Sequence, residues 1–325
     1  MASGNQSSVT EFILSGLSHS YKLQVTFFTL FLILYLMTLS GNFIIMTAVY
    51  IDPRIRSPMY FFLSNLSFLD MCYSTVTLPK MLSNVFSETK SITFNHCMSQ
   101  LFFLHLFGGT ECFLLTAMAY DRYVAICNPL MYHIVMNHRF CHRLIAYTWL
   151  AGFLHSFTQA FLTYQLHFCG PNKINHFFCD VHPLSALACS DTFFIDIFIV
   201  ANSGMISLGC FVVLLFSYLG IITTILKIQS PEGRRKAFST CGSHIMVVTF
   251  FFGPCVFIYM RPPVNYSVDK VVSVLYTVLT PFLNPTIYTL RNQDMKNALK
   301  KLVEVKVSSK SAIHNKVKDI HKDPD

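Results

Sequence analysis

An acid and a base stand side by side where a long apolar stretch of the sequence ends. Asp121 and Arg122, followed by Tyr123, lie in a run that extends from Met118 to Cys127. A charged pair is costly inside a bilayer, so we expect it at the membrane boundary, where an ionisable group is a functional hypothesis by default. The pattern favours a conformational switch. The alternative is an ordinary ion pair at a helix end.

Two further acids, Asp70 and Glu111, fall inside apolar stretches at a common predicted depth. At a helical rise of roughly 1.5 Å per residue, Asp70 lies about 18 Å from the start of its span and Glu111 about 16 Å from Arg122. Glu111 and Arg122 then share one helix face. Two facing carboxylates in a low dielectric favour a sodium ion or a shared proton. The alternative is a structural hydrogen-bond network.

The last apolar stretch contains two prolines and two polar side chains. Pro281 and Pro285 remove backbone hydrogen bonds, while Asn284 and Tyr288 carry groups that can exchange partners. Together with the acid and base described first, this favours a bundle with two states over a merely kinked helix. No nucleophile or water-activating metal motif accompanies the acids, so we do not expect an enzyme.

These residues must be positioned by membrane-spanning helices. The 325 residues are 53% hydrophobic and 12% charged, with a mean hydropathy of +0.49, whereas soluble domains are about a quarter charged. We predict an all-α membrane protein, a seven-transmembrane helix bundle over residues 24–290. The predicted spans are 24–50, 58–82, 94–127, 140–164, 193–228, 236–260 and 268–290.

The basic residues predict the orientation of this bundle. If the N-terminal segment 1–23 is extracellular, 18 of the 24 Lys and Arg residues lie on the inner side, as the positive-inside rule requires. The net charge of +8 then indicates contact with anionic membrane lipid rather than nucleic acid. A glycosylation sequon at Asn5 fits this orientation. We expect a short amphipathic helix at 291–303 and a cytoplasmic tail at 304–325.

Four of the eleven cysteines are predicted to lie outside the membrane, on the oxidising side: Cys97, Cys169, Cys179 and Cys189. Two disulfides among them would restrain the long loop near 165–192 as a lid over the mouth of the bundle. The spacing alone leaves all three connectivities open.

With these residues described, the chain resembles the odorant receptors among the rhodopsin-like G-protein-coupled receptors, over nearly its whole length. Phe107–Glu111 and Phe168–Asn172 resemble class II, family 4. Met131 and Phe252 depart from the family, where His and Tyr are commoner, and Phe252 cannot hydrogen-bond. The motifs that carry the resemblance are Gly41-Asn42, Pro58–Ser67, Met118–Cys127, Ser217-Tyr218, Lys236–Cys241 and Pro281–Asn292.

The resemblance implies a Cys97–Cys179 disulfide, a Cys169–Cys189 disulfide, and a cation site at Asp70 and Glu111. It also implies activation of a heterotrimeric G protein of the stimulatory, olfactory or Gs type, which raises cyclic AMP. The expected location is the plasma membrane, in the cilia of olfactory sensory neurons. The residues implied in coupling or switching are Asp121, Arg122, Tyr123, Tyr218, Lys236, Ser239, Asn284, Pro285 and Tyr288.

A ligand pocket is expected in the outer half of the bundle, above Glu111. Its lining would be mostly apolar with a few hydrogen-bonding groups, which suits a small volatile molecule. The candidate lining residues are Leu104, His105, Gly108, Asn202, Ile206, Cys255, Tyr259, Val274 and Thr277, with Gln159 and Asp180 as further members.

His105 has several roles open to it: a pH-sensitive group, a hydrogen-bond donor, a ligand for a soft metal, or a histidine satisfied by a neighbouring carbonyl. Other functions also stay open. A metabolite-sensing receptor outside the nose would carry the same motifs, whereas an ion-coupled transporter is disfavoured because the sequence contains no internal repeat.

Overall fold

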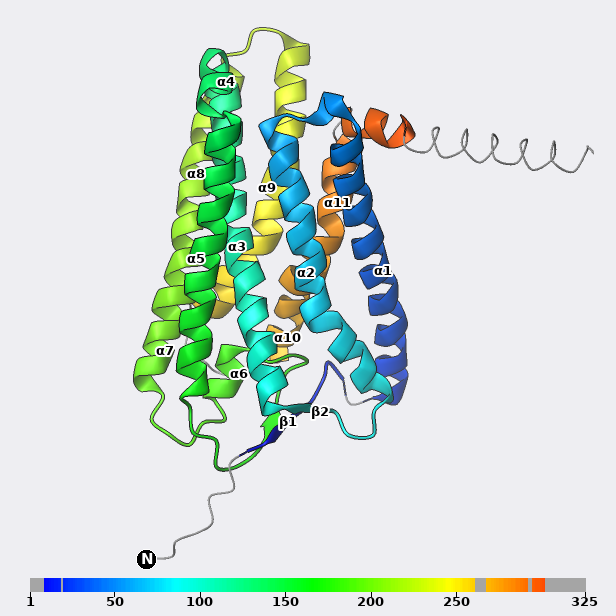
Figure 1. The fold of residues 1–325 in the computed structure, drawn as a ribbon, viewed down its shortest axis with the longest axis vertical. Helices are drawn as coiled ribbons and strands as arrows, with labels where there is room; N and C mark the ends of the chain where they lie inside the picture. The colour runs from blue at the N-terminus through cyan, green and yellow to red at the C-terminus, as the bar shows by residue number, and fades with distance from the viewer. Residues whose placement is uncertain (1–8, 19, 261–266, 292–293, 302–325) are drawn as a thin grey trace, which may run out of the picture.

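The computed structural model describes residues 9–18, 20–260, 267–291 and 294–301, with the side chains of residues 236, 239, 240, 243, 267 and 288–291 left aside. The sequon at Asn5, the tail from residue 302, and the side chains of Lys236, Ser239 and Tyr288 lie outside this description. Within it, long helices run side by side as one elongated bundle (Figure 1).

Helical segments cover all seven predicted spans in the described part of the chain. Three of these segments are long and apolar enough to cross a membrane by length and composition alone: α1, α3 and the run Phe193–Leu226. The first four are α1 (Tyr21–Ile51), α2 (Pro58–Phe86), α3 (Phe94–Cys127) and α5 (His138–Tyr164). The last three are α7 (Phe193–Ile199) continued by η3 (Val200–Gly204) and α8 (Met205–Leu226), then α9 (Pro231–Tyr259), then α10 (Ser267–Val274) continued by η4 (Leu275–Leu279) and α11 (Thr280–Arg291).

Local sequence signals set several helix starts. The Thr93 hydroxyl accepts from the backbone N–H of His96 at the start of α3, and Asn137 Oδ1 accepts from that of Phe140 at the start of α5. The helix α9 begins at Pro231, because Ser230 caps it and proline is favoured in a first helical turn.

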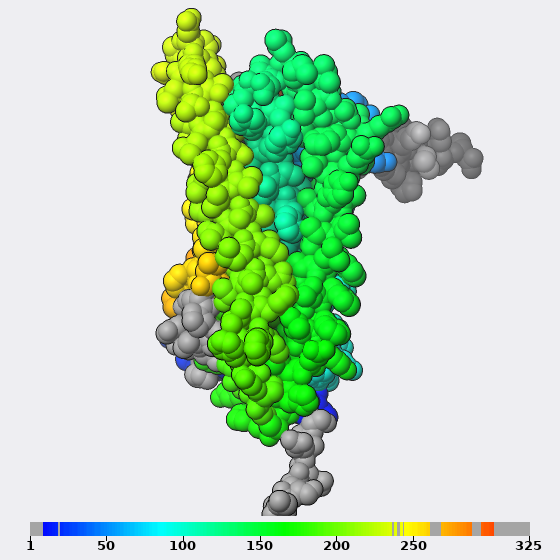
Figure 2. All heavy atoms as spheres, turned by 90° about the vertical axis from the view of Figure 1, so that its left-hand side faces the viewer, coloured from blue at the N-terminus to red at the C-terminus, as the bar shows by residue number. Residues whose placement is uncertain are grey.

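The helix α3 lies at the centre of the bundle and packs against α2, α5, α8 and α9. The outer helices turn large apolar side chains away from the core, as lipid-facing helices do. Figure 2 shows one such side, where α5 and α8 lie side by side. The exposed apolar side chains there include Leu150, Leu154, Phe157, Phe161, Val213, Leu215, Phe216 and Leu219.

A small sheet that the sequence did not predict marks one end of the bundle, called here the sheet end (Figure 1). Strand β1 (Glu11–Leu14) pairs antiparallel with β2 (Ser91–Thr93) and parallel with β3 (Lys173–Ile174), in the order β2-β1-β3. The N-terminal segment is thereby held against the loop that follows α5. The opposite end, called the far end, carries η1 (Pro53–Ile55), η2 (Pro129–Met131) and α4 (Tyr132–Val135).

Candidate functional site

Two disulfides fix the loop between α5 and α7 at the sheet end. Cys97 in the first turn of α3 is joined to Cys179, with Cα atoms 5.5 Å apart, and Cys169 is joined to Cys189. These are the pairs that the resemblance implied. The backbone N–H of Cys179 also donates to Gln100 Oε1 of α3 at 2.9 Å. The next residue, Asp180, is therefore held directly over the bundle.

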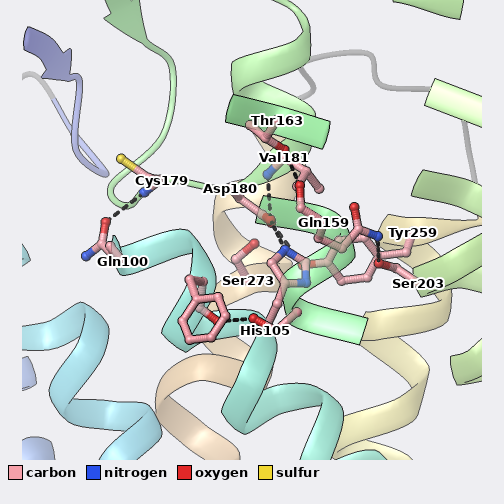
Figure 3. A network of polar contacts seen from close by, with 12 residues as sticks. Gln100, His105, Gln159, Thr163, Cys179, Asp180, Val181, Ser203, Tyr259 and Ser273 are labelled. Carbon is pink, nitrogen blue, oxygen red and sulfur yellow. Dashed lines mark hydrogen bonds and ion pairs between the residues drawn. The ribbon is translucent and has the colours of Figure 1, made fainter. Parts of the chain in front are cut away.

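Asp180 is a buried carboxylate with three hydrogen-bond donors. Its Oδ1 accepts from the backbone N–H of Val181 at 2.8 Å and from His105 Nε2 at 3.1 Å, and its Oδ2 accepts from the Tyr259 hydroxyl at 3.0 Å (Figure 3). Burial alone would raise the pKa of Asp180. The hydrogen bond and field of His105 outweigh that effect and hold the pKa at about 2. The loop acid is thus charged, and it ties α3 to α9.

The structure identifies the hydrogen-bond partner of His105. The imidazole is satisfied by the Asp180 carboxylate, not by a neighbouring carbonyl. No group of three or more His, Cys, Asp or Glu side chains capable of holding a metal occurs among the described residues.

A small cavity lies beside this network, between α3, α8, α9 and the two π-helical turns η3 and η4. His105 and Tyr259 form part of its wall, so the Asp180 network directly borders the space. The full lining is Tyr73, Leu104, His105, Gly108, Gly109, Cys112, His155, Ser203, Ile206, Ser207, Phe251, Cys255, Tyr259 and Tyr276.

The structure gathers six of the eleven predicted pocket residues around this cavity: Leu104, His105, Gly108, Ile206, Cys255 and Tyr259. Three others lie behind the lining, in contact with residues that border the cavity. Gln159 donates to Ser203 at 2.7 Å, Asn202 pairs with His155 at 3.2 Å, and Asp180 holds His105 and Tyr259. Val274 is half-buried in α10, and Thr277 donates to the Ser273 carbonyl, so neither lines the cavity.

Two of the lining residues that the sequence did not indicate lie on π-helical turns. Ser203 in η3 lines the cavity where its neighbour Asn202 was expected, and Tyr276 in η4 does so beside the expected Thr277. A π-turn inserts an extra residue, so positions counted on a regular helix lose register there. Cys112, by contrast, could have been found by four-residue spacing from Gly108.

A second polar cluster lies deeper, where Asp70 and Glu111 are both fully buried. Asn284 of α11 donates its amide to both Asp70 oxygens, at 2.9 and 3.1 Å. Asn42 joins the cluster region by donating to the Pro281 carbonyl at 3.2 Å. Neither Glu111 oxygen has a hydrogen-bond partner among the described residues.

At the far end, the acid and base behave differently from a simple pair. Asp121 is buried and accepts a 2.8 Å hydrogen bond from the Tyr132 hydroxyl in α4. No salt bridge among the described residues joins Asp121 to Arg122, because adjacent helical positions point in different directions. The interpretation as an ordinary helix-end ion pair is therefore wrong. Tyr218 of α8 is hydrogen-bonded to His244 of α9.

Comparison with known proteins decides what this architecture is. The family described as "Olfactory receptor" matches residues 31–306. Olfactory receptor 4E2 of Mus musculus is 55% identical over 309 residues, covering 95% of this chain and 100% of the relative. Olfactory receptor 4S2 of Homo sapiens is 55% identical over 90% of this chain and 94% of the relative, and human olfactory receptor 4E1 is 56% identical over 92% and 95%.

The chain belongs to the olfactory receptor family. It is therefore an odorant receptor with a seven-transmembrane fold, coupling to G proteins as the family does, and it is not an enzyme. The likeness to family 4, proposed from residues 107–111 and 168–172, agrees with these relatives.

The departure of this receptor at position 252 has a visible structural consequence. Phe252 is fully buried, stacks on Phe211 of α8 with ring centroids 6.1 Å apart, and meets Phe251 edge-on at 5.3 Å. Phe251, not Phe252, lines the cavity. The ring at 252 thus contributes apolar packing between α8 and α9, without a hydrogen bond to α3.

Proposed function

We propose that the cavity beside the Asp180 network holds a small volatile odorant and that the sheet end faces the cell exterior. The single observation that carries this proposal is that His105 and Tyr259 border the cavity while both are held by one buried carboxylate. A ligand that displaces either side chain would change the hydrogen bonds of Asp180, and so would affect both the loop and α9. Such coupling is what a ligand needs in order to shift a conformational equilibrium.

The lining indicates the chemistry of the ligand. The cavity is small and is lined mainly by apolar and aromatic side chains, as small-molecule pockets commonly are. Its hydrogen-bonding groups are the Ser203 and Ser207 hydroxyls, the His105 and His155 imidazoles, and the Tyr73, Tyr259 and Tyr276 phenols, but most of its surface is apolar. A mainly apolar molecule with one hydrogen-bonding group, such as an alcohol, aldehyde or ketone, fits this balance.

We propose that ligand binding moves α9 and opens the far end to a stimulatory G protein of the olfactory or Gs type, raising cyclic AMP. Two hydrogen bonds at the far end, Asp121–Tyr132 and Tyr218–His244, are contacts that such a movement could break. Arg122, with Lys236 and Ser239, would then contact the G protein. The predicted location is the plasma membrane of olfactory sensory neurons, in their cilia.

A second proposal concerns Asp70 and Glu111, which would share a sodium ion or a proton. The support is the unpaired Glu111 carboxyl group, with Asn42 Oδ1, Asn284 Oδ1 and Ser74 Oγ also lacking donors among the described residues. Oxygen atoms without donors suit a hard cation, which takes oxygen ligands. Buried carboxylates require such compensation because burial of an unpaired charge is costly.

The experiment that tests the main proposal is cyclic AMP production in cells that express the receptor with an olfactory-type G protein, against a broad panel of volatiles. We expect a response to at least one class, lost in Arg122→Ala at matched surface expression. Lys22→Ala, at an exposed position on α1, is the matched control and should respond normally. A response that survives Arg122→Ala would refute the proposed coupling role.

A further inference from the structure

A second, small cavity opens at the sheet end between the N-terminal segment, α1 and α2. It shares no lining residue with the cavity beside Asp180. Its wall has two chemically different parts. Phe27, Phe28 and Phe31 of α1 make one side, whereas Gln24, Asn84 and Lys90 place polar groups on the other.

The polar part carries an ammonium group without a counter-charge. Lys90 Nζ donates to Gln24 Oε1 at 2.9 Å, and Gln24 in turn donates to the Ser18 carbonyl at 2.8 Å. No salt bridge within the described residues involves Lys90. A lysine ammonium has three N–H donors, so Lys90 can still donate to an anionic acceptor.

Lys90 thus favours an anionic occupant of the cavity, and Asn84 adds a second requirement for that occupant. The side chain lines the cavity, is only 7% exposed, and its Oδ1 accepts no hydrogen bond from the described residues. Leaving a buried amide oxygen without a hydrogen bond costs free energy, so an occupant that donates a hydrogen bond would be favoured. Together with Lys90, this calls for a headgroup that has both an anionic acceptor and a hydroxyl donor.

The apolar part gives the third requirement. Gln24 and Phe31 are seven residues apart on α1, so the aromatic wall extends roughly 10 Å from the polar end. Leu23 and Leu30 of α1 are 48% exposed on the side that faces lipid. An alkyl chain bound in the cavity would therefore lie close to an apolar, exposed side of α1.

We propose that this cavity binds a single-chain lipid whose headgroup carries a phosphate monoester and a free hydroxyl, that is, a lysophospholipid of the phosphatidate type. The phosphate accepts from Lys90, the hydroxyl donates to Asn84, and the chain lies against Phe27, Phe28 and Phe31. This site is separate from the odorant cavity, and its occupation would stabilise the attachment of the N-terminal segment to α1 and α2.

The test is equilibrium binding of tritiated 1-oleoyl lysophosphatidic acid to the full-length receptor in phosphatidylcholine nanodiscs. We expect saturable binding that falls about tenfold or more in Lys90→Met, the loss typical of a charge-assisted hydrogen bond. Asn84→Leu should also weaken it. Lys22→Met, which removes an exposed lysine outside the cavity in the first turn of α1, should leave binding unchanged.

Competing lipids separate the headgroup requirements and the source of the ligand. Oleate has the anion but no hydroxyl donor, and 1-monooleoylglycerol has the hydroxyls but no anion, so both should compete at least about tenfold more weakly. Equal competition by dioleoyl phosphatidic acid, which has two chains, would overturn the single-chain assignment. Non-saturable binding, or saturable binding that neither Lys90→Met nor Asn84→Leu weakens, would overturn the site.

Photolabelling of the unmodified receptor with a photoreactive lysophosphatidate tests the site without any variant, and so does not depend on whether the variants fold. A diazirine in the acyl chain should label residues of α1 and α2 near 24–31 and 81–85. Labels confined to other helices would refute the proposal.

Discussion

Asp180 and Glu111 are both buried acids of this receptor, yet their surroundings differ completely. Asp180 receives hydrogen bonds from a backbone N–H, an imidazole and a phenol. Glu111 receives none from the described residues. A buried acid with all its donors present fixes the structure around it, whereas one without donors must take a proton or a cation. The same kind of side chain thus fixes the loop in one region, whereas in the other it supports the proposed sodium or proton site.

The largest effect should come from removing the satisfied acid. Asp180→Ala leaves His105 and Tyr259 without their partner, and breaking a buried ionic network in this way costs about 3–5 kcal/mol. We expect a large fall in the thermal unfolding midpoint of the purified receptor and poor surface expression. Asp191→Ala, in the same loop, is the control and should have little effect. An unfolding midpoint equal to that of the wild type would show that the network does not stabilise the lid.

Acidification should loosen the same loop through His176. Burial against Phe177 and Phe178 lowers the pKa of His176 to about 4, and burial also lowers that of His182. In the unfolded chain the His176 imidazole binds protons more readily than in the folded receptor. The contribution of neutral His176 to folding stability is therefore complete above about pH 6.5 and is lost as the pH falls toward 4. From pH 7 to 5 the loss should be about 2 kcal/mol. Asp180 titrates lower and does not contribute in this window.

Comparing the unfolding midpoints of wild type and His176→Phe at pH 7 and pH 5 measures this effect. The variant should lose less stability on acidification than the wild type. Identical pH dependence in both proteins would exclude His176 as its source.

Sodium should increase the stability of the receptor through Glu111 and not through Asp180. If a cation binds at Asp70 and Glu111, sodium at ten times its dissociation constant adds about 1.4 kcal/mol of stability relative to choline. Glu111→Gln should abolish this difference while folding normally, because the amide needs no counter-charge. A sodium effect that persists in Glu111→Gln would place the ion elsewhere, and no effect in either protein would favour a proton.

The smallest effect should follow loss of one donor to Asp180. Tyr259→Phe removes one hydrogen bond and keeps the ring, so we expect a loss of about 1 kcal/mol. Since Tyr259 also borders the cavity, agonist potencies should shift unequally across the panel. Tyr164→Phe, on the exposed face of α5, is the matched control. Unchanged potencies for every agonist in Tyr259→Phe would remove this phenol from the ligand site.

The sequence predicted the long helices well because each is a sustained apolar run. Predicted and observed bounds of the third span coincide at Phe94 and Cys127. The short strands β1 to β3 were not predicted, since two to four residues carry too little pattern. Their pairing depends on chain segments far apart in sequence.

Residues that line the cavity were predicted correctly where the helices are regular and were missed where the helices contain π-turns. Leu104, His105 and Gly108 share one face of α3 and line the cavity. Ser203 and Tyr276 were displaced from their expected register by π-turns, which no spacing rule revealed. The role of Asp180 depends on the loop's tertiary path, so it was predicted only as a further pocket member.

The most direct test of the odorant cavity is a pair of tryptophan substitutions at consecutive positions of α8. Ile206 lines the cavity, whereas Met205 is 55% exposed on the outside of the helix. Concentration–response curves for cyclic AMP should show at least about a tenfold loss of agonist potency in Ile206→Trp, since even one methylene alters binding in an apolar pocket by about tenfold or more. Met205→Trp should match the wild type. Equal potency in wild type and Ile206→Trp, at equal surface expression, would contradict the account.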